Sequence, residues 1–194
     1  PIVYTRWRAA LGKLLFVDVF TRLMEAAGVR RMSVFVLAPG GGDKSLTSEL
    51  MAETRLPSRV SCAQAPYRIM GQSAFVTATR AWSETAARAC LLIVSNPGFL
   101  YATNPSTLAV FFERLNAHWA AVRDLADVLG SGRAPELRAL FTRVATRGAA
   151  ARLRRAAASS TCPPLEELLP GLEAWSCWDG GYVRPFLERA RRFL

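Results

Sequence analysis

The sequence predicts an α/β fold in which helices pack on a mixed sheet. Apolar residues recur at three- and four-residue spacing in several segments, short apolar runs stand between these segments, and turns that contain glycine or proline separate the two. Such alternation favours strands with at least some parallel pairing. With 194 residues, 51% of them hydrophobic, the chain can bury a sizeable core, so we expect one globular unit over residues 1–194.

The first helix is expected between Thr5, which can cap it, and Gly28, which can end it. The run MSVFVL from Met32 then predicts a strand, and YRIM from Tyr67 predicts a second, short extended piece. The apolar positions expected on the buried face of the helix are Trp7, Leu11, Leu14, Leu15, Phe20, Leu23 and Ala27.

The segment LAPGGGDKSL, residues 37–46, has some features of a phosphate-binding loop. A Walker-type loop requires a glycine, four residues and then Gly-Lys-Ser/Thr before a helix. Here the three glycines are contiguous, and Asp43 stands where a glycine must precede Lys44, so its carboxylate would repel a phosphate. We therefore predict a flexible strand-to-strand connection and keep a nucleotide-binding loop with Lys44 as a minor alternative.

Ser83 is expected to cap a helix that runs through Val94 and stops at the turn 96–98, before the apolar run FLYAT. Asn104, with Pro105 at the first helical position, begins the strongest helical pattern of the chain. We expect one long helix here, ending at Gly130, with a continuous apolar stripe of Leu108, Phe111, Phe112, Leu115, Trp119, Val122, Leu125 and Leu129.

The last part of the chain predicts a short helix from Pro135 through Val144 and a helical turn within PLEELL that Pro170-Gly171 interrupts. A strand is expected over residues 172–177. The loop WDGGY follows it, at the position where open α/β sheets bind ligands.

The formal net charge of +10 raises the alternative of a basic helical module that binds nucleic acid or another polyanion. Its cations would be Arg147, Arg152, Arg154 and Arg155. Two observations weaken this alternative: the richest cluster, RLRRAAASS, has no interleaved aromatic residue, and the scarcity of lysine is typical of a GC-rich genome.

The cysteines and the histidine offer little material for catalysis or metal binding. Cys62, Cys90, Cys162 and Cys177 are far apart and form no C-x-x-C pair, and His118 is expected to be a packed or surface residue. No apolar run approaches the roughly 20 residues of a membrane span, and residues 1–30 lack the pattern of a signal peptide. We therefore expect a cytoplasmic protein with no metal site and no membrane partner.

Four stretches together resemble the auxin-responsive acyl-acid amido synthetase family of adenylate-forming enzymes. They are PIVYT at the start, SVFVL with the following glycine loop, residues 78–122, and LLPGLEAWSCWDGGYVRPFL, residues 168–187. The resemblance covers essentially the whole chain. It implies an enzyme that uses ATP and Mg²⁺ to activate a small carboxylic acid as an acyl-adenylate and then transfers the acyl group to an amine, with an amino acid as the expected acceptor.

The resemblance also implies that residues 1–194 are an incomplete part of the large N-terminal domain of such an enzyme, without its small C-terminal domain. The family's phosphate loop would precede residue 1, and its magnesium- and nucleotide-holding glutamate would follow Leu194. We therefore assign no catalytic residue, expect the fragment alone to be inactive, and expect apolar surface exposed along an edge or face of the sheet.

Family positions transfer to two groups of residues. The acyl pocket would consist of Phe16, Val17, Phe20, Thr103, Ser106, Thr107 and Val110, and the nucleotide site of Asp179, Gly180, Gly181 and Tyr182. The two phenylalanines would form apolar walls, while the N-terminus of the Asn104-capped helix would offer free N–H groups and a positive dipole to a carboxylate.

Two departures leave the substrate open. Val17 stands where several family members have an arginine that engages the acid, and Asp179 stands where a threonine usually precedes the glycine. By their residue types alone, Phe16 and Phe20 also fit an ordinary core, Ser106 and Thr107 an ordinary helix start, and Gly180-Gly181 an ordinary turn.

Overall fold

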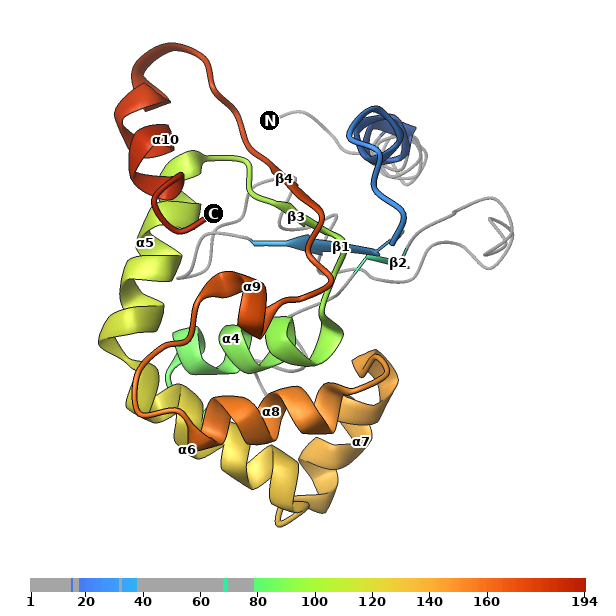
Figure 1. The fold of residues 1–194 in the computed structure, drawn as a ribbon, viewed down its shortest axis with the longest axis vertical. Helices are drawn as coiled ribbons and strands as arrows, with labels where there is room; N and C mark the ends of the chain where they lie inside the picture. The colour runs from blue at the N-terminus through green and yellow to red at the C-terminus, as the bar shows by residue number, and fades with distance from the viewer. Residues whose placement is uncertain (1–14, 16–17, 32, 38–67, 70–78) are drawn as a thin grey trace, which may run out of the picture.

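The structure, a computed structural model, describes residues 15, 18–31, 33–37, 68–69 and 79–194. Its described strands are β1 (Ser33–Val36), β2 (Arg68–Ile69), β3 (Phe99–Tyr101) and β4 (Ala174–Ser176), which form one sheet in the order β2-β1-β3-β4. Helices lie on both sides of this sheet (Figure 1). The predicted α/β class is confirmed at this level.

Every described strand pairing is parallel, so the carboxyl ends of the strands lie at one edge of the sheet. The antiparallel component that a mixed sheet would include is not found among these four strands. The chain passes from β1 outward to β2 and then returns to the other side of β1 for β3 and β4. This reversal creates a switch point between the carboxyl ends of β1 and β3.

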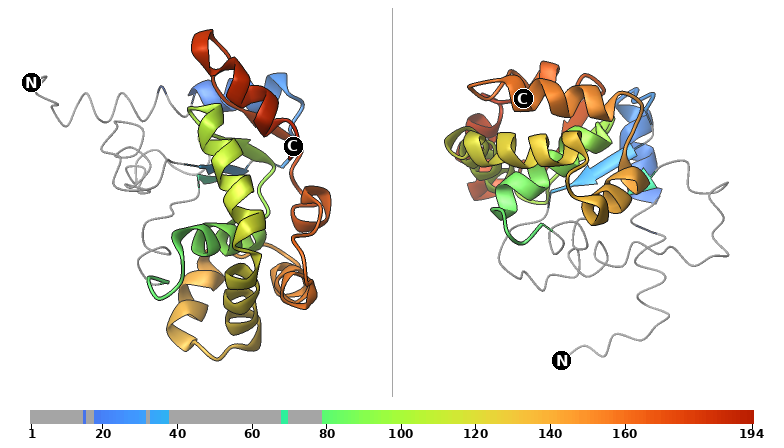
Figure 2. Two further views of the ribbon diagram at one scale, coloured as in Figure 1. Left: turned by 90° about the vertical axis from the view of Figure 1, so that its left-hand side faces the viewer. Right: turned by 90° about the horizontal axis from the view of Figure 1, so that it is seen from below.

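The two faces of the sheet are buried by different helices. Val34 and Val36 pack with Phe20 and Met24 of the helical segment 18–26, and the alternate residues Phe35 and Leu37 join a larger core on the opposite face. Figures 1 and 2 show the segment 18–26 on one side of the sheet and the longer helices on the other. The larger core lies among those helices and is continuous with the sheet.

The segment 18–26 ends as predicted, at Gly28. This glycine has a φ of 66°, the Val29 N–H donates to the Met24 carbonyl at 2.9 Å, and the Gly28 N–H donates to the Glu25 carbonyl at 3.0 Å. The two bonds form a Schellman motif, and its usual apolar contact is present because Met24 and Val29 belong to the same buried cluster. The predicted start at Thr5, with Trp7, Leu11 and Leu14, lies outside the described residues.

The buried face of this helix differs from the predicted one. Phe20 is buried as expected, but its partner is Met24, whereas Leu15, Leu23 and Ala27 are exposed. Leu15 and Val19, four residues apart, are 57% and 51% exposed. The described sheet is only four short strands wide, so it contacts one narrow stripe of the helix and leaves the neighbouring apolar stripe in solvent. The expectation of an incomplete domain stays a prediction.

Helix α4 (Glu84–Ser95) confirms the predicted helix after Ser83. The Ser83 hydroxyl accepts a hydrogen bond from the Ala86 N–H at 3.1 Å, and the helix ends at Asn96, which has a left-handed φ of 41°. From Ala89 to Ser95 every residue of α4 is buried. Such burial is expected for a helix that has the sheet on one side and other helices on the other.

The single long helix predicted after Asn104 is wrong. The chain forms α5 (Pro105–Ala117) and α6 (Trp119–Ser131), which are separated at His118, where φ is −112° and ψ is 24°. The whole predicted apolar stripe is nevertheless buried. Both halves contact α4, but α5 packs mainly on the C-terminal helix and α6 also packs on α8, so the break lets the two halves reach different helices. His118 itself is exposed, so of the two expectations for it, a packed or a surface residue, the second is confirmed.

The remaining helices are α7 (Pro135–Val144), α8 (Ala149–Ala158), α9 (Leu165–Leu168) and α10 (Arg184–Ala190), with a 3-10 turn, η1 (Gly181–Val183), before the last. The predicted helix at 135–144, the helical turn in PLEELL and the strand within 172–177 are therefore confirmed. Helices α6 and α8 lie side by side (Figure 2). No described helix is long and apolar enough to cross a membrane.

Candidate functional site

The candidate site lies at the carboxyl edge of the sheet, where backbone hydrogen bonds continue the strand pairing beyond β3 and β4. The Ala102 N–H donates to the Ser176 carbonyl at 3.1 Å, and the Trp178 N–H donates to the Thr103 carbonyl at 3.3 Å. The edge is also joined to β1, because the Leu37 N–H donates to the Tyr101 carbonyl at 2.7 Å. Thr103 and Trp178 are thus neighbours beside the switch point.

The first turn of α5 begins at this edge, but it does not offer the predicted free N–H groups. Pro105 has no N–H, the Ser106 N–H donates to the Asn104 side chain at 2.9 Å, and the Thr107 N–H donates to the Asn104 carbonyl at 3.0 Å. The expectation of free donors is therefore wrong for these residues, because the cap that makes the helix also satisfies them. What remains is the dipole, about half a positive charge, and the three hydroxyl groups of Thr103, Ser106 and Thr107.

The loop after β4 faces the start of α5 and exposes two aromatic rings. Trp178 is 67% exposed and Tyr182 is 86% exposed. Gly180 leaves room for the indole, since a Cβ placed on it would lie 2.8 Å from Trp178 Nε1, and Gly181 adopts a left-handed φ of 67° that starts the η1 turn. The loop therefore combines flat apolar rings with exposed backbone and the Asp179 carboxylate, which together can hold a planar polar ligand.

Helix α10 anchors the far end of this loop on α5. The Arg189 guanidinium makes a two-pronged ion pair with Glu113, in which Nη2 lies 2.6 Å and 2.8 Å from the two carboxylate oxygens. The rings of Phe112 and Phe193 stack with their centroids 5.9 Å apart. Because both ends of the loop are held, the loop and the α5 start form one unit. Sequence reasoning missed Glu113 and Arg189, since no local spacing relates two charges on distant helices.

The predicted site residues fall into three groups. Thr103, Ser106 and Thr107 on one segment and Asp179, Gly180, Gly181 and Tyr182 on the other are brought to the same edge, and Val110 lies partly buried in the next turn of α5. Phe16 and Val17 lie outside the described residues. Phe20 is only 1% exposed, and its ring makes edge-on contacts with Tyr101 at 4.8 Å and with Phe99 at 6.2 Å, so it packs as an ordinary core residue.

The described cysteines are not activated thiols. Burial raises the pKa of Cys162 to about 11, and it also raises the pKa of the fully buried Cys90. Cys177, at the end of β4, has its pKa raised by burial and then by the neighbouring Asp179, while Arg191 acts in the opposite direction. All three thiols are therefore protonated near neutral pH, and a thiolate nucleophile is not available from them. Cys62 lies outside the described residues.

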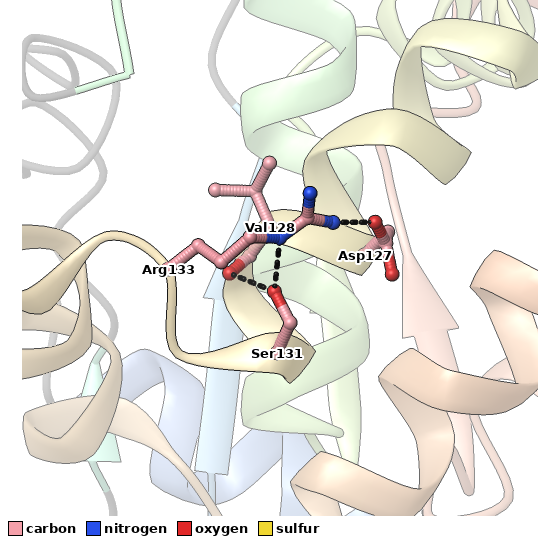
Figure 3. Close-up of polar contacts among 4 residues, drawn as sticks. All are labelled: Asp127, Val128, Ser131 and Arg133. Atoms are coloured by element: carbon pink, nitrogen blue, oxygen red, sulfur yellow. Dashed lines mark hydrogen bonds and ion pairs between the residues drawn. The ribbon is translucent and has the colours of Figure 1, made fainter.

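Two other features of the described part of the chain carry no site. Side chains of α4, α5 and α9, among them Ala89, Leu115 and Leu168, line a small apolar hollow that has no polar group to orient a ligand. At the end of α6, Arg133 donates to the Ser131 hydroxyl at 2.9 Å and pairs with Asp127 (Figure 3). These side chains bond one another at the end of the helix, so they do not indicate a ligand site.

No cluster of three metal-ligating side chains occurs among the residues that the structure describes. The chain matches no protein-family model, no curated protein and no solved structure. The candidate site is therefore defined by geometry alone: the capped start of α5, the aromatic glycine loop, and the sheet edge that joins them.

Proposed function

We propose that the chain is part of an acyl-acid amido synthetase, an adenylate-forming ligase that joins a carboxylic acid to an amine, with an amino acid as the expected amine. One observation supports this most. The family resemblance assigns residues 103–107 to the acid and residues 179–182 to the nucleotide. The two segments are far apart in the sequence, but both follow strands of one parallel sheet, and Trp178, directly before the second segment, donates its N–H to the Thr103 carbonyl. The finer fold assignment, part of the large N-terminal domain, belongs to the same proposal.

In this proposal the start of α5 orients the acid. The helix dipole attracts the carboxylate, and the hydroxyl groups of Thr103, Ser106 and Thr107 can donate hydrogen bonds to it. Since the N–H groups of Ser106 and Thr107 are already bonded, the hydroxyl groups are the available donors of this turn. An acid with an apolar body fits better than a second charged group, because Val110 follows one turn further along the helix.

The loop after β4 receives the nucleotide in the same proposal. Trp178 and Tyr182 offer exposed ring faces for the base, and Asp179 can accept hydrogen bonds from ribose hydroxyl groups. ATP would supply the adenylyl group that activates the acid, with release of pyrophosphate before the amine displaces AMP. We assign the phosphates and Mg²⁺ to no described residue, because the N–H groups of Ser106 and Thr107 are already bonded and the described residues form no cluster of metal ligands.

The alternative of a basic polyanion-binding helix is weakened, because Arg152, one of its four arginines, is not available to a ligand. Arg152 is buried, and its guanidinium donates to the carbonyls of Ile93 and Val94 and to the Thr146 hydroxyl at 2.7–2.9 Å. If this guanidinium moved to bind nucleic-acid phosphates, it would leave these buried acceptors without their hydrogen bonds, which is unfavourable. The P-loop alternative depends on Lys44, which lies outside the described residues.

ATP–pyrophosphate exchange in the full-length protein tests the proposal against a panel of carboxylic acids. We expect exchange with at least one acid, and we expect Thr103→Val and Asp179→Asn each to reduce it by about tenfold through the loss of one hydrogen bond to a charged or polar ligand group. Asp127→Asn, at the distant end of α6, is the matched control and should leave exchange unchanged. The absence of acid-dependent exchange with every acid would contradict the proposal.

A further inference from the structure

The C-terminal end of α4 is held by two arginines from different parts of the chain. Arg152 of α8 donates through Nε to the Ile93 carbonyl at 2.8 Å and through Nη2 to the Val94 carbonyl at 2.9 Å. Arg31, which precedes β1, donates through Nη1 to the Asn96 carbonyl at 3.0 Å. Two guanidinium groups are therefore fixed at one helix end.

This helix end lies at the amino edge of the sheet, opposite the candidate site. The Gly98 N–H, just before β3, donates to the Ser33 hydroxyl at the start of β1 at 3.0 Å, and the Gly171 N–H, before β4, donates to the Asn96 side chain at 2.9 Å. Figure 1 shows α4 ending on the side where β1 and β3 begin. Whatever binds here is therefore separate from the proposed nucleotide and acid sites.

Arg155 adds a third positive charge at the same place. It follows Arg152 by three residues on α8, so the two side chains lie on one side of that helix, and Arg155 is exposed. The pKa of Arg152 is lowered first by burial and then by the charges of Arg31 and Arg155, which agrees with the proximity of all three. We name Arg31, Arg152 and Arg155 the α4-end cluster.

Arg31, Arg152 and Arg155 form no ion pair with a described carboxylate. Glu173, whose carboxylate accepts the Arg30 N–H at 2.6 Å, lies 3.9 Å from Arg30 Nε and so pairs with a residue outside the cluster. The C-terminal dipole of α4 contributes about half a negative charge, so roughly two and a half positive charges are left uncompensated by it. An excess of this kind in a small region attracts a compact anion.

We propose that the α4-end cluster binds a free phosphate group in its doubly negative form. Arg31 and Arg155 are exposed and retain N–H groups for which no acceptor is described, and the planar fork of a guanidinium matches two phosphate oxygens. Arg152 acts through its fixed charge, because most of its donors are used. A compact ligand fits better than an extended polyanion, since the next exposed arginine on α8, Arg154, extends over Gly130 of α6.

Titration of the protein with inorganic phosphate, followed by ³¹P NMR and by calorimetry at constant ionic strength in chloride, tests this site. We expect saturable binding with one phosphate per chain. Arg155→Gln should weaken it by about tenfold, as expected for the loss of a charge-assisted hydrogen bond, and Arg31→Gln should have a similar effect. Arg154→Gln is the matched control on the same helix and should bind as the wild type does.

Arg155→Gln is the decisive variant because it breaks no described hydrogen bond, whereas Arg31→Gln also removes the bond to the Asn96 carbonyl. Thermal unfolding without phosphate identifies any loss of folding in either variant. The proposal is overturned if phosphate binding does not saturate, or if Arg154→Gln weakens it as much as Arg155→Gln. Tight binding of a mixed-sequence DNA duplex without binding of free phosphate would also overturn it, in favour of a polyanion surface.

Discussion

Replacing Arg152 by methionine should destabilise the fold strongly, because this guanidinium donates hydrogen bonds to carbonyl groups at the buried C-terminal end of α4. The Arg152 guanidinium donates a buried hydrogen bond to the Ile93 carbonyl of α4 at 2.8 Å and a partly buried one to the Arg147 carbonyl, just before α8, at 3.0 Å. The Val94 carbonyl loses less, since the Thr146 N–H and hydroxyl also donate to it, at 3.2 Å and 3.1 Å. Methionine preserves much of the side-chain volume, so the change mainly removes the donors and the charge.

The magnitude follows from the acceptors left without a donor. Hydrogen bonds from a charged group contribute about 1.5–3 kcal/mol each, so the loss of two gives roughly 3–6 kcal/mol. Part of this is offset, because methionine no longer requires the desolvation of a buried charge. We therefore expect a decrease of about 2–4 kcal/mol in the free energy of unfolding, which corresponds to a fall in Tm of roughly 4–16 °C for a chain of this size.

Urea denaturation followed by circular dichroism measures this decrease. Arg154→Met is the matched control, because Arg154 is exposed on the same helix, and it should change the free energy of unfolding by no more than about 0.5 kcal/mol. Arg152→Lys should fall between the two, since an ammonium group keeps the charge but cannot bond all the acceptors in the geometry of a fork. Equal stabilities of Arg152→Met and Arg154→Met would refute the reasoning.

Three further predictions concern other contacts. Gly98→Ala should lower the free energy of unfolding by about 3 kcal/mol or more in urea denaturation, because its Cβ would overlap the Arg31 carbonyl oxygen and lie 2.8 Å from the Arg31 Cβ; a change below about 1 kcal/mol would contradict the close packing. Glu113→Arg and Arg189→Glu should each speed amide hydrogen exchange in residues 178–183, because each places two like charges together. The double variant restores the opposite charges and should restore protection. Exchange that stays fast in the double variant would mean that the ion pair does not hold the loop. Cys162, with its pKa raised to about 11, should react with iodoacetamide at pH 8 roughly a hundredfold more slowly than in the unfolded chain, because less of it is thiolate. Its reaction rate should rise as the pH approaches 11. Mass spectrometry of the labelled peptide measures the rate, and equal rates in the folded and unfolded chains would contradict the burial.

The sequence by itself determined the local elements, because their signals are local. Ser83 and Asn104 cap the helices that follow them as expected, because their side-chain oxygens accept hydrogen bonds from N–H groups of the first turn. Gly28 ends the first helix, because glycine readily adopts the positive φ that this end requires. Neither effect depends on residues far away in the sequence. The strand within residues 33–37 and the loop after β4 were predictable for the same reason. Part of the candidate site followed, because both predicted segments lie directly after strands.

Only the tertiary structure decided which apolar and charged residues face which partners. The apolar stripe from Leu108 to Leu129 is continuous in the sequence, yet the helix is interrupted at His118. Both halves contact α4, but α5 packs mainly on α10, whereas α6 also packs on α8. Leu15 and Leu23 look like core residues but are exposed, since the described sheet is wide enough to cover only the stripe with Phe20 and Met24. Arg152 looks like a surface cation but is buried, because carbonyl groups of α4, far from it in the sequence, provide its acceptors. The spacing of apolar residues indicates which side chains can be buried, whereas contacts between distant segments determine which residues bury them.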